Sequence, residues 1–235
     1  MQHNHLSGDI RPLQHLSVGV AVGGIVIPGA SGTGGAIVQD PAGVRHLLSC
    51  NHVLYLNGAV LRGRDSAAVV SPGSRELRVV AVVRGIPEFC RLTTGSNNAG
   101  DYAIAELTAR DFWTRAPGMP KLCLRHPISP SRTVGQRVWK AGAGTGVTSG
   151  VVKSVDYQLS LWYDSMNVRF HFGRQILIGS EDGAPFSEAG DSGALVVTEG
   201  GAGVGIVCAQ TAQGAVASPL VGLFDSLGLH FVLEG

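Results

Sequence analysis

The chain has 235 residues, of which 44% are apolar and only 15% are charged, and it contains 34 glycines and 11 prolines. The charged share lies well below the roughly 25% of typical globular chains, which argues against intrinsic disorder. Lysine and arginine number 18 against 17 aspartate and glutamate residues, for a net charge of +1. This balance excludes a strongly basic nucleic-acid-binding surface and an acidic field for cations.

The start of the chain and its cysteines predict a compartment. Residues 1–9 lack a basic start followed by an apolar run, so we expect no secretory signal. No apolar stretch reaches the roughly 18 residues of a membrane-spanning helix. The cysteines lie far apart and form no CxxC pair, which favours reduced thiols: Cys50, Cys90, Cys123 and Cys208. These features predict a cytoplasmic protein that does not bind membranes.

Short β-like runs, separated by glycine, proline, asparagine and serine, dominate the chain. We expect a first set of strands at 18–22, 25–27, 33–39, 45–49, 67–70, 77–83 and 102–107. We expect a second set at 137–141, 148–155, 167–172, 176–178, 194–198 and 204–210. Strands at this density, with turn signals between them, indicate an all-β barrel or sandwich.

Two segments depart from the strand pattern. Four prolines between residues 111 and 132 predict an extended linker between the two strand sets. Near the C-terminus, Ser218 is suited to an N-cap, with Pro219 at the first helical position. Apolar residues follow at helical spacing, and Gly228 supplies a stop. We therefore expect a short amphipathic helix over 218–228, packed on the strands.

A glycine-flanked serine lies in the segment Gly190-Asp191-Ser192-Gly193, directly before an apolar strand. Glycine permits positive φ, so the turn can direct the N–H groups of Gly190 and Ser192 to one point beside the serine hydroxyl. Two such donors stabilise the oxyanion that forms when a nucleophile attacks a carbonyl. An ordinary Asp-Ser-Gly turn explains the same residues, and Ala194 excludes the G-x-S-x-G elbow of α/β-hydrolases.

A serine nucleophile needs a base, and among eight histidines His52 has the most suitable context. It follows the apolar strand 45–49 and a few small polar residues, which places the imidazole at a strand end beside the core. The alternative is a structural histidine. Cys50 and His52 could also be two metal ligands, but no second pair with ligand spacing exists, so we expect no metal.

The base in turn needs an anion to fix its tautomer. Asp101 is the best candidate, because it opens an alternating strand behind a turn-rich loop. Taken alone, it could simply cap that turn. The other aspartates considered, Asp111, Asp156 and Asp164, lack this context.

The order His52, Asp101, Ser192 is that of the two-barrel proteases and differs from the order in α/β-hydrolases. The chain resembles the trypsin-like, chymotrypsin-fold serine proteases over nearly its whole length from about Val18. The segments that carry this resemblance are 49–53, 100–105 and 190–193, with a lysine-glycine turn at 138–142 and 148–151. Segments 172–176 and 186–187 look closest to an intracellular bacterial branch that resembles the plant narrow-leaf-type protease.

The resemblance implies two packed, six-stranded Greek-key β-barrels with a short C-terminal helix. His52 would act as general base and then general acid, Asp101 would orient it, and Ser192 would attack a peptide bond. The amides of Gly190 and Ser192 would form the oxyanion hole. The expected domains are an N-terminal extension at 1–16, a first barrel at 17–110, a linker at 111–132 and a second barrel at 133–235 with the helix 218–228.

The resemblance also implies partners and a specificity. We expect a protein or peptide substrate and no cofactor, nucleic acid or membrane. The base of the family's specificity pocket falls on Phe186, and the wall that binds substrate backbone falls on Cys208, Ala209 and Gln210. Because Phe186 is not acidic, we expect cleavage after a small or medium apolar residue. The alternative is that Phe186 belongs to the core and points away from the pocket.

Two departures from the family matter. Secreted relatives carry a bridged cysteine directly after the histidine, where this chain has Val53, and this favours a reducing compartment. Their activated forms pair a new N-terminal amine with the aspartate before the serine. Asp191 is present, but no activation site is evident before Val18, so a buried Asp191 needs another cation or donor. This keeps open a regulatory or binding module that stays inactive until a partner protein forms the oxyanion hole. A weaker alternative is an esterase or acyl transferase with the same triad.

Overall fold

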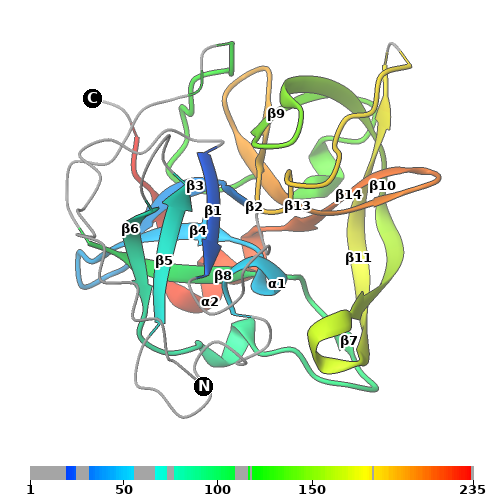
Figure 1. The fold of residues 1–235 in the computed structure, drawn as a ribbon. Helices are drawn as coiled ribbons and strands as arrows, with labels where there is room; N and C mark the ends of the chain where they lie inside the picture. The colour runs from blue at the N-terminus through cyan, green and yellow to red at the C-terminus, as the bar shows by residue number, and fades with distance from the viewer. Residues whose placement is uncertain are drawn as a thin grey trace.

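The structure is a computed structural model that describes residues 20–24, 32–55, 67–72, 77–108, 116, 118–181 and 183–233. Its strands form two sheets, which lie side by side in Figure 1. The predicted strand 25–27 and the expected N-terminal extension 1–16 lie outside the described residues. No helix in the described part of the chain is both long and apolar enough to cross a membrane.

The first sheet has eight strands. Its order is β15 (His230–Phe231), β3 (Ala36–Gln39), β4 (Arg45–Ser49), β8 (Ala103–Leu107), β6 (Leu77–Val83), β5 (Ala67–Pro72), β1 (Val20–Gly24) and β2 (Gly32–Gly34). Only Gly35 separates β2 from β3, so the two sides of this sheet meet on one stretch of chain and the sheet closes into a barrel. The Gly35 amide donates to the carbonyl of Leu48, 2.9 Å away, at this junction.

The second sheet has seven strands. Its order is β10 (Gly146–Tyr163), β9 (Arg137–Gly142), β12 (Leu195–Thr198), β13 (Gly203–Thr211), β14 (Gly214–Pro219), β11 (Val168–Ser180) and β7 (Asn97–Asn98). Because β10 also pairs with β11, the strands β9 to β14 close into a second barrel. The prediction of an all-β chain with two barrels is confirmed.

The two halves exchange short segments. β7 belongs to the first half of the sequence but pairs in parallel with β11 of the second sheet. β15 lies at the C-terminal end but pairs with β3 of the first sheet. One cluster of buried side chains runs from Leu47 and Leu48 in the first barrel to Leu195 and Ile206 in the second. The barrels are therefore joined by shared strands and by a shared core.

Short helices complete the described chain. α1 (Asn51–Leu54) is a single turn after β4, and α2 (Val221–Leu227) follows β14 and buries Leu223 and Phe224. Single 3-10 turns occupy η2 (Glu88–Cys90), η3 (Pro130–Arg132) and η4 (Asp164–Met166). The buried pair on α2 accounts for the apolar spacing seen in the sequence, and the short C-terminal helix is confirmed as an element.

Several boundaries differ from those predicted, and three of the differences are large. The helix begins at Val221 and not after Ser218, because Ser218 and Pro219 end the strand β14, which the sequence analysis missed. The Ser218 hydroxyl is used in tertiary contacts and caps no helix. β10 continues to Tyr163 and β11 runs unbroken to Ser180, so the two form a long hairpin on the right of Figure 1.

Candidate functional site

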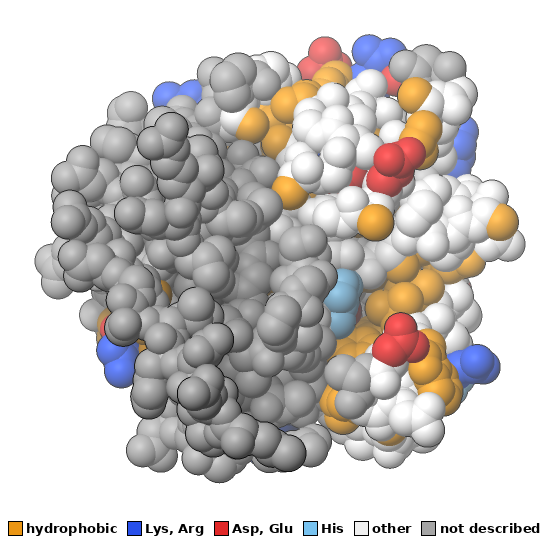
Figure 2. Space-filling model, viewed as in Figure 1, with side chains coloured by type: hydrophobic (Ala, Val, Ile, Leu, Met, Phe, Trp, Pro, Cys, Tyr) orange, Lys and Arg blue, Asp and Glu red, His pale blue; other side chains and the backbone are white. Residues whose placement is uncertain are grey.

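His52 lies on α1, the single helical turn that follows β4. Its neighbour Val53 is buried, and the His52 side chain keeps 29% of its surface exposed. In Figure 2 a histidine surface is visible near the middle of the face shown, where the charged side chains of the described residues are scattered and do not gather into one field. The strand end thus delivers an imidazole with one side on the core and one side open.

Asp101 is fully buried beside this histidine. One carboxylate oxygen, Oδ2, contacts His52 Nδ1, and the other, Oδ1, accepts the backbone N–H of His52 at 3.1 Å. Held by a carboxylate, Nδ1 carries the proton and leaves Nε2 as the free acceptor. Burial lowers the pKa of His52, but the charge and hydrogen bond of Asp101 outweigh it, so the pKa is raised overall.

The backbone of Ser192 is bound to the first barrel. Its carbonyl accepts the Thr33 amide of β2 at 2.7 Å. A Cβ placed on the adjacent Gly32 would lie 2.9 Å from that carbonyl and would also collide with the Val53 methyls, next to His52. The backbone of Ser192 and the turn that carries His52 therefore approach the same glycine from two sides.

The carbonyl oxygen of Val207 also joins the turn that carries Ser192 to the turn that carries His52. The carbonyl of Val207 on β13 accepts the Gly193 amide at 2.7 Å and the Cys50 thiol at 3.1 Å. Gly193 follows Ser192, and Cys50 precedes His52 by two residues. Within the described residues the Ser192 hydroxyl makes no hydrogen bond to His52. In unliganded sites this bond often shortens only when substrate binds.

The turn around Ser192 uses the glycine conformations that the sequence indicated. Gly190 has φ 97° and Gly193 has φ 96°, both in the left-handed region. The Thr33 hydroxyl donates to the Gly190 carbonyl at 2.7 Å and accepts the Ala143 amide at 2.9 Å. Among the described contacts, the amides of Gly190 and Ser192 donate to no other group. Two donors without a partner beside a serine are what an oxyanion requires.

Asp191 has its cation inside the same chain. Lys140 Nζ of β9 lies 3.0 Å from Asp191 Oδ2, and both side chains are completely buried. The ammonium also donates to Thr145 Oγ1 and, at 3.0 Å, to the Gly146 carbonyl, so each of its three protons has an acceptor. Lys140 is therefore the partner of Asp191, which the sequence alone did not identify.

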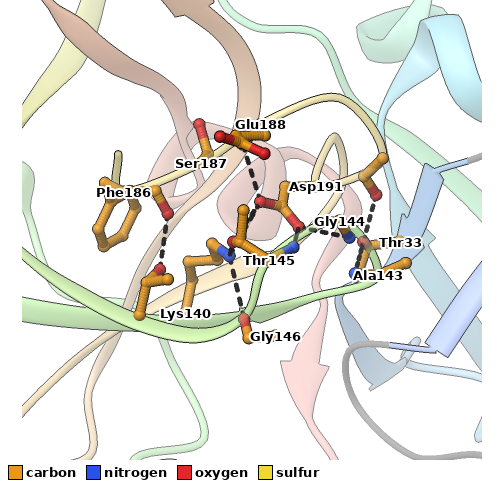
Figure 3. A network of polar contacts seen from close by, with 12 residues as sticks. Thr33, Lys140, Ala143, Gly144, Thr145, Gly146, Phe186, Ser187, Glu188 and Asp191 are labelled. Atoms are coloured by element: carbon orange, nitrogen blue, oxygen red, sulfur yellow. Dashed lines mark hydrogen bonds and ion pairs between the residues drawn. The ribbon is translucent and has the colours of Figure 1, made fainter. Parts of the chain in front are cut away.

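The rest of the Asp191 carboxylate is saturated with donors, as Figure 3 shows. Oδ1 accepts the amides of Gly144 at 2.8 Å and Thr145 at 3.1 Å. Oδ2 accepts the Thr145 hydroxyl at 2.7 Å and the Glu188 amide at 2.9 Å. Burial raises the pKa of Asp191, but the hydrogen bonds from the Glu188 amide and the Thr145 hydroxyl, together with Lys140, outweigh this effect, so the pKa is lowered overall. The turn before Ser192 is thus fixed without any group from outside the described chain.

The predicted pocket residues have two different environments. Phe186 is 2% exposed and packs in the core of the second barrel, and its carbonyl accepts the Thr148 hydroxyl. Cys208 is also buried, whereas Gln210 is exposed on the same strand, β13. The hydroxyl of Ser187 donates to Gln210 Oε1 at 3.0 Å, so the segment before Ser192 and the strand β13 face each other. Ala209 lies between Cys208 and Gln210 and pairs with Val216 of β14.

Cys50, His52 and Asp101 bring three ligand-type atoms within 4.8 Å of one another. Burial raises the pKa of the Cys50 thiol well above its usual range, so the thiol stays protonated and donates to Val207. The Nδ1 atom of His52 is already bound to the carboxylate. Because zinc binds thiolates and free imidazole nitrogens, these residues fit a hydrogen-bonded pair better than a metal centre. All four cysteines of the chain are free.

Sequence reasoning missed several residues that hold the site. Lys140 could have been found, because it lies two residues after the apolar Val138 on a strand and so shares its inward face while carrying a charge. Thr33 and Ser218 carry no such signal, since a buried hydroxyl on a strand is ordinary. Tyr163, whose hydroxyl donates to Asp101 Oδ1, ends an alternating apolar pattern, so its strand could have been predicted but its contact with Asp101 could not.

No protein-family model matches the chain, and no curated protein sequence matches it significantly. Solved structures do match its fold. The Nocardiopsis protease NAPase is 14% identical, with a TM-score of 0.61, 92% of this chain covered and 98% of that one. A glutamic acid specific serine protease that uses a histidine triad in substrate binding is 19% identical, with a TM-score of 0.57 and coverage of 92% and 100%. The chymotrypsin of Cellulomonas bogoriensis is 16% identical, with a TM-score of 0.57 and coverage of 94% and 100%. The fold is therefore that of the chymotrypsin-like serine proteases.

Proposed function

We propose that the chain is a serine endopeptidase in which His52, Asp101 and Ser192 form the catalytic triad. The observation that carries the proposal is the buried contact of Asp101 with His52 Nδ1, which leaves Nε2 free at the junction where the Ser192 turn is bound. The fold shared with serine proteases supports it.

The reaction follows from these groups. His52 Nε2 takes the proton of the Ser192 hydroxyl while the oxygen bonds to the substrate carbonyl carbon. The resulting oxyanion accepts the amides of Gly190 and Ser192, and Asp101 stabilises the imidazolium. The C–N bond then breaks as His52 returns the proton to the leaving amine. Water, deprotonated by His52, releases the acyl group and restores the serine.

The decisive experiment replaces Ser192 and compares labelling by a fluorophosphonate probe. Ser192→Ala should abolish both labelling and peptide hydrolysis. The chain offers a matched control, because Ser160 Oγ lies 2.8 Å from His171 Nδ1 on the exposed hairpin, a serine–histidine pair to which no carboxylate of the described residues is bound. Ser160→Ala should label like the parent. Equal labelling of Ser192→Ala and the parent would overturn the assignment.

The regulatory or binding module is distinguished by the same probe. That alternative arose because the sequence showed no cation for Asp191, and Lys140 supplies one. We therefore expect labelling without an added partner. A folded parent that never labels would favour the binding module, and hydrolysis of short esters without casein digestion would favour an esterase.

Substrate preference forms the finer part of the proposal. Ser187 and Gln210, which face each other beside the Ser192 turn, are polar but uncharged. They provide no carboxylate for an arginine or lysine side chain, so we propose cleavage after a small or medium apolar residue. A peptide library in which only the residue before the cut varies would test this, and a preference for a basic residue would contradict it. A cytoplasmic, bacterial setting stays a prediction, supported by the four free cysteines.

A further inference from the structure

The buried Asp101 has a third donor that comes from the other half of the molecule. The hydroxyl of Tyr163 donates to Asp101 Oδ1 at 2.8 Å. Tyr163 is the last residue of β10, at the end of the long hairpin, and is only 4% exposed. Each oxygen of the carboxylate is therefore bound: Oδ2 to the imidazole, and Oδ1 to the His52 amide and to Tyr163.

The ring of Tyr163 is held as firmly as its hydroxyl. It packs edge-on against Phe170 of β11, with ring centroids 4.9 Å apart, and edge-on to the His52 ring at 6.1 Å. Burial and the neighbouring Asp101 raise the pKa of Tyr163 well above its usual range, so the phenol remains a donor. The hairpin thus presents one fixed hydroxyl to the acid that orients the base.

The hairpin also holds the loop that carries Asp101. β11 pairs with β7, and the Asn98 side chain donates to the His171 carbonyl at 2.9 Å. Further along, the Ser218 hydroxyl accepts the Asp101 amide at 3.0 Å and donates to Gln175 Oε1 at 2.8 Å. The hairpin therefore binds the Asp101 carboxylate through Tyr163, and β14 binds the Asp101 backbone through Ser218.

We propose that Tyr163 is a positioning residue of the active site, whose hydroxyl fixes the Asp101 carboxylate and thereby the orientation of His52. This inference rests on the proposed function. Its hydroxyl binds Asp101, so we assign Tyr163 a positioning role that acts on His52 through this carboxylate. Donation of its proton also disperses the negative charge that Asp101 presents to the imidazole.

The test is Tyr163→Phe, which removes the hydroxyl and keeps the ring. The control is Tyr157→Phe on the same strand, whose hydroxyl donates to Gln213 on the surface. The first readout is the NMR titration of the His52 ring in a Ser192→Ala background, which needs no activity. Because less charge is dispersed, the pKa of His52 should rise by about half a unit or more in Tyr163→Phe and stay unchanged in Tyr157→Phe. An unchanged or lowered pKa would overturn the proposal.

The second readout is kinetic. Tyr163→Phe should lower kcat about tenfold with little change in KM, because the hydroxyl orients the base and does not bind substrate. Equal kcat values for both tyrosine variants would also overturn it. If Tyr163→Phe does not fold, the unsubstituted chain with 13Cζ-labelled tyrosine serves instead: the Tyr163 resonance should move with the titration of His52, and a flat response contradicts the proposal. Failure of the parent to label would sink the protease assignment, while the titration still reports on Tyr163.

Discussion

Lys140 and Asp191 form an ion pair, 3.0 Å apart, in which neither side chain is exposed to solvent. The pair joins β9 to the residue directly before Ser192, so the shape of the serine turn depends on it. A buried charge that loses its partner is costly, because neither water nor another cation replaces the partner.

Lys140→Met should therefore destabilise the chain by about 3 kcal/mol, at the low end for a broken buried pair because Asp191 keeps its other hydrogen bonds. It should also abolish labelling of Ser192. Denaturant unfolding and the fluorophosphonate probe measure the two effects. Lys153→Met, on the exposed face of β10, is the control and should change neither. The double variant Lys140→Met/Asp191→Asn should lose less stability than the sum of the single changes, and simple additivity would show that the pair is not coupled.

Activity should fall at alkaline pH through the same pair. Burial lowers the pKa of Lys140 below 10.5, although Asp191 opposes this effect. When the ammonium loses its proton, Asp191 loses its cation and the turn loses its support. Because the pKa is lower in the folded than in the unfolded chain, deprotonation is easier in the folded state, so this group causes no loss of stability with rising pH. We expect kcat/KM to fall as the pH rises, with the midpoint of this alkaline fall below pH 10.5. The denaturant midpoint of unfolding should not fall over the same pH range.

At acid pH the activity should follow His52. Its pKa is raised above 6.5 by Asp101 against the effect of burial, and the protonated imidazole cannot accept the proton of Ser192. The value of kcat/KM should fall as the pH drops through a midpoint above 6.5. Asp101→Asn should move that midpoint to lower pH and reduce kcat about 10⁴-fold. An acid limb at the same pH in both forms would show that Asp101 does not control the base.

The contribution of His52 to the free energy of unfolding has the opposite pH dependence to its contribution to activity. Since the folded pKa lies above the unfolded one, the contribution is complete below the unfolded value and is lost as the pH rises through the folded value.

Gly142 tests the space around Asp191. A Cβ at this position would overlap with Asp191 Oδ1, so Gly142→Ala should push the carboxylate away from its donors. We expect a loss of about 3 kcal/mol and of most activity. Gly200 has no atom within 4 Å of its virtual Cβ, and Gly200→Ala should stay within about 0.5 kcal/mol of the parent. Thermal unfolding of the two variants side by side separates a steric effect from the general cost of replacing a glycine.

The sequence carried good information wherever the signal was local. The end of the apolar strand before His52 and the turn before Asp101 could both be read from neighbouring residues, and the structure brings these two side chains into contact. The glycines around Ser192 likewise indicated the left-handed turn conformations. Strand alternation was also informative beyond Val155, where Tyr157, Leu159, Leu161 and Tyr163 share one face of β10, but the predicted strand ended too early.

The sequence did not predict contacts in which one residue type can serve several purposes. Ser218 before a proline has the pattern of a helix cap, yet its hydroxyl is bound to Asp101 and Gln175, and the helix begins three residues later. Lys140 and Asp191 lie far apart in the sequence, with β10 and β11 between them, and no local pattern pairs them. The contact of Tyr163 with Asp101 depends on the length and twist of a hairpin, which propensities do not specify.

The hairpin of β10 and β11 has an exposed tip and a buried end. Asp164 and Asn167 are open to solvent, while the adjacent Tyr163 is covered. Cleavage of one peptide bond at this tip by another protease would free the C-terminal side of Tyr163 and leave the other strands of both barrels uncut. If Tyr163 positions Asp101, we expect limited digestion at this tip to lower kcat while the barrels stay folded, and a gel run beside an activity assay would measure both.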